Sequence, residues 1–372
     1  MVEAARIGAS SRAGRRVETS GADQMKFGVF DHIEMTDRTM AAAFRERIEF
    51  VKAADEAGFW GYHVAEHHAS PLNTVPVPGV WLGAVAQATK RIHMGPLGYL
   101  LPLYSPLRLA EEICILDHLS NGRMEVGVGR GVSPFELAYH KIDHSKSREI
   151  FEDAYKCLKV ALTSDTFSYD SDRYAYKGVP VPLRPLQGPH PAFWYASSNA
   201  TGSAFAGEEG LHFVTNGPSA RAKANIDAYR EALAKRGGAA QPKGEFKGGA
   251  VIGVLRQIVV ADTDEQARAI AAPAVAEHHA NLTYLVRKHA HEGSVAQRLN
   301  IPLAATIEDA LRDGAVIAGT PDTVRAEIER QAGELGFNYL LTYPFFGSMR
   351  FDHAMRSLNL FSSEVMPQLA HV

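Results

Sequence analysis

The stretch RIHMGPLGYLLPLYSPLRLAEEICILDHLSNGRMEVGVGRG (residues 91–131) joins two short strand-like segments through a longer helical one. Residues 91–102 and 123–131 are the strand-like segments, and residues 106–119 between them have the length expected of a helix. A helix between two strands predicts that the strands run parallel, because parallel strands need a long crossover connection.

The same alternation of strand and helix extends from Met25 to nearly the end of the chain. Further strand-like segments occur at 26–30, 60–68, 192–198, 211–216, 255–261 and 338–344. Helical segments follow near 41–57, 79–89, 201 onward, 219–235, 264–290 and 350–367. About eight strand and helix pairs in this order predict an α/β fold, a (β/α)8 TIM barrel, in preference to a doubly wound sheet.

Two insertions and one extension interrupt this pattern. Residues 173–185 alternate around Lys177-Gly178 and predict a hairpin. Residues 290–317 are polar and long enough for a lid between the seventh and eighth strands. Residues 1–24 carry four arginines without a periodic apolar face and are expected to form a disordered extension. We therefore expect one barrel domain over residues 25–372.

Composition excludes several classes of protein. The 372 residues are 46% hydrophobic and carry a formal net charge of −3, with no basic face to attract nucleic acid or anionic lipid. We find neither a membrane-spanning segment nor a signal peptide, which predicts a cytoplasmic protein. Cys114 and Cys157 lie in helical segments outside any CxxC motif, so we expect small core residues in a reducing compartment.

The hexapeptide VAEHHA occurs twice, at residues 64–69 and 275–280. The first copy closes a predicted strand, where reactive groups of a parallel barrel gather, so His67 or His68 is expected at the barrel mouth. The second copy lies in a helical segment and predicts structural or solvated histidines, at most a surface or lid contact. A metal site is not expected, because adjacent histidines on a strand diverge and neither HxH nor HExxH occurs.

Two polar motifs follow the fourth and fifth predicted strands. In GVGRG (127–131), Arg130 stands between glycines, where its guanidinium could bind a phosphate or pair with a carboxylate across the rim. In ASSNATG (196–202), the hydroxyls of Ser197, Ser198 and Thr201 could cap the next helix or bind an oxyanion. Taken together on neighbouring strands, the two motifs favour a shared phosphate site.

These motifs, with MKFGVF, GFWGYHVAEHH and the late AGTPDTV, resemble the bacterial luciferase-like flavin monooxygenases from Met25 nearly to the C-terminus. The resemblance implies a barrel that binds reduced FMN at its carboxyl edge, with His67 as the catalytic histidine. It assigns Arg130 to the FMN phosphate, with Ser198 and Thr201 completing the site, and places a non-prolyl cis peptide at Pro96-Leu97. Ser197 stands where luciferase has a glutamate, and Gly129 where it has a reactive cysteine, so light emission is not implied.

The expected activity is therefore oxygenation of a small organic substrate, such as an aldehyde or ketone, by O2 and reduced FMN (FMNH2). A separate NAD(P)H:flavin reductase would supply the FMNH2, because the chain lacks a nicotinamide fingerprint. The resemblance also implies a homodimer. Three alternatives stay open: hydride transfer with the deazaflavin F420, non-catalytic flavin binding, and a metal-dependent barrel hydrolase. Aromatic residues expected either in the pocket or in the core are Phe30, Trp60, Trp81, Trp194, Tyr343 and Phe345.

Overall fold

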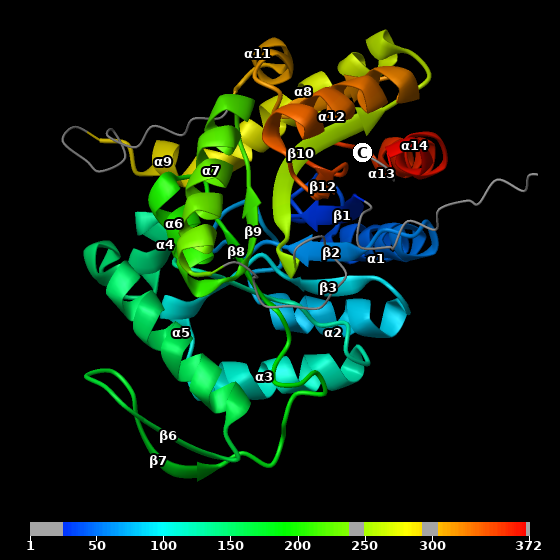
Figure 1. Ribbon diagram of the computed structural model, residues 1–372. Coiled ribbons are helices and arrows are strands. Elements are labelled where there is room, and N and C mark those ends of the chain that lie inside the picture. Colours follow the sequence, from blue (N-terminus) through cyan, green and yellow to red (C-terminus); the bar gives the residue numbers. More distant parts are fainter. Residues whose placement is uncertain (1–24, 238–248, 292–303, 370–372) are drawn as a thin grey trace, which may run out of the picture.

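The computed structural model describes residues 25–237, 249–291 and 304–369, and these form a parallel barrel wrapped by helices (Figure 1). Within this part of the chain, the strands follow the order β3, β2, β1, β12, β10, β9, β8, β5 and β4, and all neighbours are parallel. A parallel bridge between Met94 and Met124 brings β3 against the start of β5 and nearly closes the barrel. The predicted α/β barrel is confirmed.

The strands are short, as is usual in such barrels. Their bounds are β1 Lys26–Asp31, β2 Gly61–Val64, β3 His93–Pro96, β4 Tyr99–Leu100, β5 Val126–Gly129, β8 Phe193–Ala196, β9 His212–Thr215, β10 Ile252–Val260, β11 Val316–Gly319 and β12 Tyr339–Tyr343. Outside the barrel, β6 Thr166–Asp170 and β7 Ala175–Pro180 form an antiparallel pair.

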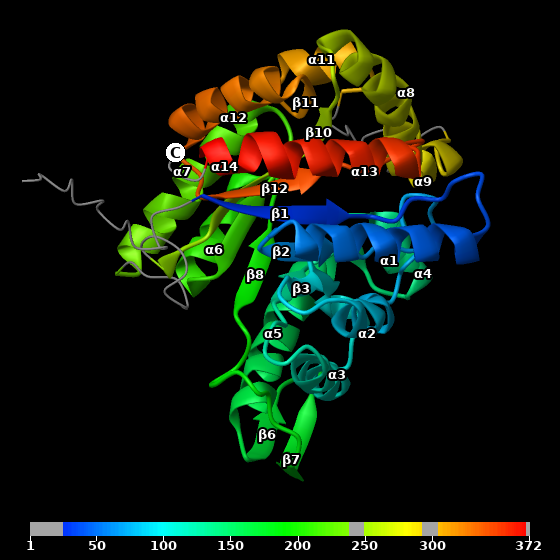
Figure 2. The same ribbon diagram turned by 90° about the vertical axis from the view of Figure 1, so that its right-hand side faces the viewer.

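Helices cover the outside of the barrel, and Figure 2 shows α1 and α13 beside strand β1. The longer helices are α1 Met40–Glu56, α2 Pro78–Ala88, α3 Pro106–Leu119, α5 Ser147–Thr163, α6 Ala200–Glu209, α7 Ser219–Lys235, α8 Asp264–Leu282, α12 Pro321–Leu335 and α13 Phe351–Leu360. Short helices are α4 Pro134–Tyr139, α9 Tyr284–Lys288, α11 Ile307–Arg312 and α14 Met366–Leu369. Several begin at a proline or after a capping Thr, Ser or Asn, which satisfies or removes the unpaired N–H groups of a first turn.

The hairpin insertion lies elsewhere than the sequence predicts. Its strands are β6 and β7, so the connecting turn falls at residues 171–174, and Lys177-Gly178 lies inside β7. Gly178 has a φ of +61° and donates its N–H to Ser168 Oγ at 2.9 Å, beside an irregularity in the pairing. The glycine therefore marks an irregular strand rather than the turn. Figure 2 shows this hairpin projecting beyond α3 and α5.

The segment 290–317 is also not a lid along its whole length. Residues 292–303 lie outside the described residues, whereas residues 307–312 form α11 and Val316 begins strand β11. Val316 and Ile317 are each only 2% exposed, and β11 pairs with the second half of β10. The missed strand is four residues long and follows a polar helix, so its apolar signal is short. The predicted extension at residues 1–24 likewise lies outside the described residues.

Strands β3 and β5 pack closely against each other near the mouth of the barrel. A Cβ atom on Gly127 would lie 2.9 Å from Leu97 Cα and nearer still to the Pro96 carbonyl oxygen. Strands β3 and β5 therefore approach each other through a residue without a side chain.

Cys114 and Cys157 are free and buried, and burial raises the pKa of their thiols to about 11 and about 12 respectively, as expected of core cysteines. No helix among the described residues is long and apolar enough to span a membrane.

Candidate active site at the carboxyl edge of the barrel

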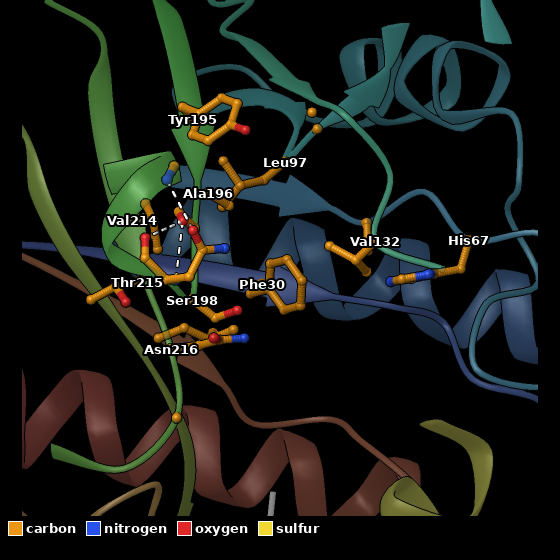
Figure 3. Close-up of a pocket in the computed structure, with 18 of the residues that line it drawn as sticks. Phe30, His67, Leu97, Val132, Tyr195, Ala196, Ser198, Val214, Thr215 and Asn216 are labelled. Carbon is orange, nitrogen blue, oxygen red and sulfur yellow. Dashed lines mark hydrogen bonds between the residues drawn. The ribbon is translucent and has the colours of Figure 1, made fainter. Parts of the chain in front are cut away.

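A cavity of about 630 Å³ opens at the carboxyl ends of the barrel strands (Figure 3). Its volume lies within the range of roughly 300–1,000 Å³ that is usual for small-molecule and cofactor sites. Figure 3 shows His67 on one side of the cavity and Tyr195, Ser198 and Asn216 on the other, with Phe30 between them. The cavity therefore has two chemically different ends.

His67 lies just beyond β2 and pairs with a carboxylate that the sequence analysis missed. Its Nδ1 atom is 3.1 Å from Oε1 of Glu136, the third residue of α4. Burial disfavours the charged imidazole, but the facing Glu136 carboxylate outweighs it, and the pKa of His67 is raised. The pKa of Glu136 is lowered in turn, because His67 and the His68 N–H offset the effect of burial. His67 is thus biased toward the imidazolium.

The other two residues of the first EHH motif hold the loop in place. Glu66 Oε1 lies 2.9 Å from His68 Nε2, and Glu66 Oε2 accepts bonds from the Leu100 N–H and the Tyr104 hydroxyl. Glu66 therefore ties the end of β2 to the end of β4. Of the two adjacent histidines, the one that lines the cavity is His67.

The second VAEHHA copy reaches the same cavity, and the expectation of at most a surface or lid contact is wrong. Helix α8 brings His278 and His279 to the cavity wall, and the His278 side chain is only 13% exposed. His278 Nδ1 lies 2.8 Å from Glu34 Oε1, beyond the end of β1. Helical periodicity could not show this, because it orients a side chain within its own helix without saying what the helix packs against.

A third imidazole, His32, completes this end of the cavity. It follows β1 and is 9% exposed, and its ring centroid lies 5.5 Å from that of His67 and 5.7 Å from that of His278. Its Nδ1 atom lies 3.1 Å from the hydroxyl oxygen of Tyr343 at the end of β12. The sequence FDHIE at residues 30–34 contains both His32 and Glu34 at a strand end, which is the signal that would have identified them. Among the described residues, no group of three or more His, Cys, Asp or Glu is spaced to hold a metal ion.

The opposite end of the cavity carries Arg130 and the start of helix α6. Arg130 lies just after β5, and in the described part of the chain it forms no ion pair; its Nη1 lies 3.5 Å from Ser147 Oγ. The expected alternative, pairing with a carboxylate across the rim, is therefore not what the described residues show. Gly131, with a φ of +82°, turns the chain directly after it.

Residues 196–202 connect β8 to α6, and some of their polar groups cap the helix while others line the cavity. Asn199 caps α6 by accepting the Gly202 N–H at 3.0 Å, and the Ser197 hydroxyl donates to the Asn199 carbonyl oxygen at 2.9 Å. Ser198 and Thr201 are exposed and line the cavity. Capping is thus carried out by Asn199, which leaves the hydroxyls of Ser198 and Thr201 for another partner.

Leu97 lines the cavity between these two ends, while Pro96 ends strand β3 behind it. The non-prolyl cis peptide that the resemblance places at Pro96-Leu97 lies one residue later, between Leu97 and Gly98. Gly98 packs against the backbone of β5, since a Cβ there would lie 2.6 Å from Gly127 C and Val128 N. Only a residue without a side chain fits at position 98, a packing requirement that the sequence motif alone does not reveal.

The aromatic candidates divide between cavity and core. Phe30 and Tyr343 line the cavity. Trp81 and Trp194 are buried and donate their indole N–H groups to Tyr62 and Glu125. Trp60 stacks on His93, and the Phe345 ring lies under the guanidinium of Arg47.

A parallel barrel with a cofactor-sized cavity at its carboxyl edge defines the class of protein as a barrel enzyme. The family model of the luciferase-like monooxygenases matches residues 25–339, and the chain belongs to that family. It is accordingly an enzyme of the monooxygenase class.

Two curated relatives span most of the chain. An uncharacterized protein, y4wF, of Sinorhizobium fredii is 36% identical and the match covers 93% of this chain and 98% of that protein. Limonene 1,2-monooxygenase of Rhodococcus erythropolis is 27% identical over 87% of this chain and 81% of its own length.

Solved structures agree on the fold. The oxygenating constituent of 3,6-diketocamphane monooxygenase of Pseudomonas putida, a type II Baeyer-Villiger monooxygenase in complex with FMN, superposes with a TM-score of 0.76 at 22% identity, covering 93% of this chain and 98% of that one. The coenzyme F420-dependent tetrahydromethanopterin reductase of Methanopyrus kandleri has a TM-score of 0.67 at 16% identity, covering 93% and 99%. At these identities the likeness extends to the barrel alone.

Proposed function

We propose that this protein uses FMNH2 and O2 to oxygenate a small organic ketone or aldehyde, with the FMNH2 supplied by a separate NAD(P)H:flavin reductase. The observation that carries the proposal is the division of one cavity into an anion-binding end, at Arg130 and α6, and an acid–base end, at His67 and Glu136. FMN has a phosphate at one end and a reactive ring at the other. A cavity with these two ends, about 630 Å³ in volume, matches such a molecule.

The phosphate is assigned to Arg130, Ser198, Thr201 and the first turn of α6. A guanidinium binds phosphate oxygens bidentately, and the N-terminus of a helix favours anions through its free N–H groups. Asn199 accepts the Gly202 N–H through its side chain and the Ser203 N–H through its carbonyl oxygen, so the N–H groups of Ala200 and Thr201 and the two hydroxyls are the donors assigned to the phosphate. Ser197 is assigned to shaping this loop, since its hydroxyl is bonded to Asn199.

The ring is assigned to the surface formed by Leu97, between the phosphate end and His67. Bound FMNH2 supplies the electrons that activate O2, which protein side chains cannot do. The chain's own residues exclude water through apolar walls such as Phe30, Val128 and Val214, and place a proton donor at His67 Nε2. Glu136 holds the His67 ring by its Nδ1 atom and so aims Nε2 away from α4.

Relatives support the substrate and partner assignments. A diketocamphane monooxygenase is a ketone oxygenase by name, and its crystallised chain is described as the oxygenating constituent. An oxygenating constituent implies a second component, which fits a separate reductase here. The homodimer implied by the family resemblance stays a prediction.

The test is O2 consumption by the purified protein with FMN, NADH, a flavin reductase and a panel of cyclic ketones and aldehydes. We expect substrate-dependent uptake of O2 and a product heavier by one oxygen atom, labelled when 18O2 is used. Reduction or oxidation of F420 by the protein without O2 uptake would establish the F420 alternative. Tight FMN binding without turnover of any substrate would indicate a non-catalytic flavin-binding protein.

A further inference from the structure

The three imidazoles at the acid–base end are each oriented through the Nδ1 atom. His67 Nδ1 contacts Glu136 at 3.1 Å, His278 Nδ1 contacts Glu34 at 2.8 Å, and His32 Nδ1 contacts the Tyr343 hydroxyl at 3.1 Å. Which nitrogen of a histidine carries the proton follows from the partner of the other nitrogen. The partners therefore determine the protonation of His32.

Glu34 is the group from which the assignment starts. Its Oε1 accepts bonds from Tyr343 at 2.7 Å, His278 at 2.8 Å and the Gly347 N–H at 2.9 Å, while Oε2 accepts from Asn281 at 2.8 Å. Burial opposes its ionisation, but contacts such as those with His278 and Asn281 lower the pKa of Glu34 to about 2. An ionised carboxylate can only accept hydrogen bonds.

The ionised Glu34 carboxylate determines which atom donates in the hydrogen bonds from Tyr343 to Glu34 and from His32 to Tyr343. Because Glu34 can only accept, Tyr343 must donate its single hydroxyl proton to Glu34. The Tyr343 oxygen can then only accept from His32, so His32 Nδ1 carries a proton. The charge of the ring is set by its surroundings: burial, His67 and His278 together lower the pKa of His32 well below its usual value, against the opposing effect of Glu34. His32 is therefore neutral, and its Nε2 atom holds a lone pair.

We propose that His32 Nε2 is a fixed hydrogen-bond acceptor of the reaction site, held in that form by Tyr343 and Glu34, and that it works beside the donor Nε2–H of His67. Tyr343 and Glu34 are positioning residues for His32. Among the described residues, neither Nε2 atom has a hydrogen-bond partner, and both rings line the cavity. One acceptor and one donor thus stand side by side, with ring centroids 5.5 Å apart.

This arrangement narrows the substrate class, and that part of the inference rests on the proposed function. A carbonyl oxygen accepts a bond from His67, while His32 needs a donor on the same molecule. An α-hydroxy ketone provides both on neighbouring carbons, whereas a simple ketone leaves His32 unpaired. Since one hydrogen bond contributes about 0.5–1.5 kcal/mol, the hydroxyl should tighten binding roughly 2–12-fold.

The protonation of His32 can be measured without cofactor or substrate. In protein labelled with 15N-histidine, long-range 1H–15N spectra at pH 7 should show His32 neutral with Nδ1 protonated and Nε2 bare. Signals lost in a His32→Gln variant assign the residue. A charged His32, or a proton on Nε2, would overturn the proposal whatever the activity of the enzyme.

Two variants of strand β12 separate positioning from general damage. Tyr343→Phe removes the acceptor of His32 Nδ1 and should shift His32 toward the Nε2–H form. Tyr339→Phe removes a hydroxyl bonded to another buried histidine, His63, at 3.1 Å, and should leave the His32 signals unchanged. An unchanged His32 spectrum in Tyr343→Phe would show that Tyr343 does not position it.

The substrate class is tested by the affinities of 2-hydroxycyclohexanone and cyclohexanone, measured by saturation-transfer NMR on the protein with and without FMN. We expect the hydroxy ketone to bind more tightly and the preference to vanish in His32→Leu. Equal affinity, or binding of neither compound, overturns the substrate class. Failure of FMN to bind would count against the proposed function, while the His32 spectrum tests the acceptor separately.

Discussion

The histidines of this barrel have different roles because their hydrogen-bond partners and their burial differ. His67 faces the Glu136 carboxylate and its pKa is raised. His63 lies deep in the barrel, where burial lowers its pKa to about 4 despite the attraction of Glu125. An ordinary imidazole titrates near 6.5, so the balance between burial and the attraction of a nearby carboxylate decides which form is favoured. The chemistry of each histidine is therefore a property of its contacts.

Replacing His67 by alanine should leave FMN binding intact and reduce the oxygenation rate by roughly 10²–10⁴-fold, the usual contribution of a general acid or base. FMN affinity is measured by fluorescence titration and the rate by 18O-labelled product. His118→Ala is the control, because His118 lies on the outer face of the barrel and bonds the Arg184 carbonyl. Turnover in His67→Ala equal to that of the parent would remove His67 from the reaction.

The dependence of the rate on pH should follow the pair of His67 and Glu136. The pKa of His67 is raised, so its proton is retained above pH 6.5 and is lost as the pH rises through that raised value. Glu136→Gln removes the attraction while burial remains, so the alkaline fall in rate should move to lower pH. Glu49→Gln, on the exposed face of α1, should leave the profile in place. An unmoved alkaline limb in Glu136→Gln would contradict the role of the pair.

Whole elements create the anion-binding end, since neither Arg130 nor the α6 N-terminus is sufficient alone. Strand β5 and strand β8 pair directly, so the loops that follow them emerge side by side. The start of α6 and the guanidinium of Arg130 are thus brought to the same cavity wall. Neighbouring strands of a parallel sheet place their following loops at one edge, which is why the two motifs could be associated before the structure was known.

Arg130→Ala should weaken FMN binding about 10–150-fold, because hydrogen bonds to charged groups contribute roughly 1.5–3 kcal/mol. Riboflavin, which lacks the phosphate, provides the matched ligand: its affinity should be the same for Arg130→Ala and the parent protein. Fluorescence quenching of both flavins measures this. Equal weakening for FMN and riboflavin would show that Arg130 does not bind the phosphate.

Gly127→Ala should separate strands β3 and β5, because the added Cβ would meet the backbone of Pro96 and Leu97. Overpacking of this kind costs about 1–3 kcal/mol of the free energy of unfolding, measured by denaturant titration. The control is Gly333→Ala in α12, where a Cβ meets nothing within 4 Å. That variant should be as stable as the parent or slightly more so, since alanine favours a helix. A loss in Gly333→Ala equal to that in Gly127→Ala would contradict the packing argument.

The molecule as a whole is one parallel barrel whose cavity collects residues from strands β1, β5, β8, β9, β10 and β12, from helix α8 and from the loop that follows β2. A ligand that bridges so many elements stabilises the folded state, because it binds that state alone. With FMN at 100 times its dissociation constant, the stabilisation is about 2.7 kcal/mol, which for a chain of this length corresponds to a rise of roughly 3–4 °C in Tm. Differential scanning fluorimetry measures it, and no rise at saturating FMN would contradict the binding assigned here.

The order of strands and helices along the chain predicts the barrel and some residues of each of its two polar ends. Strands and helices alternate in the pattern of apolar residues, and a parallel barrel gathers its loops at the carboxyl edge, so His67 or His68, Arg130, Ser198 and Thr201 are expected there. The family resemblance selects His67 from the two adjacent histidines. Four-residue strand β11 and the true turn of the hairpin were not found, because a short apolar segment or a lone glycine has several structural explanations.

The two VAEHHA copies show what local sequence can and cannot predict about a side chain. The strand before the first copy predicts its place at the barrel mouth, whereas the helix of the second copy predicts at most a surface or lid contact. The structure nevertheless brings His278 to the same cavity, where it contacts Glu34. Glu136 lies in a segment distant from the one that holds His32 and Glu34, and the proton positions depend on contacts such as the one between His32 and Tyr343, 311 positions apart in sequence. Periodicity describes each element separately. Charge and hydrogen-bond direction arise only when the elements pack, so they belong to the folded molecule.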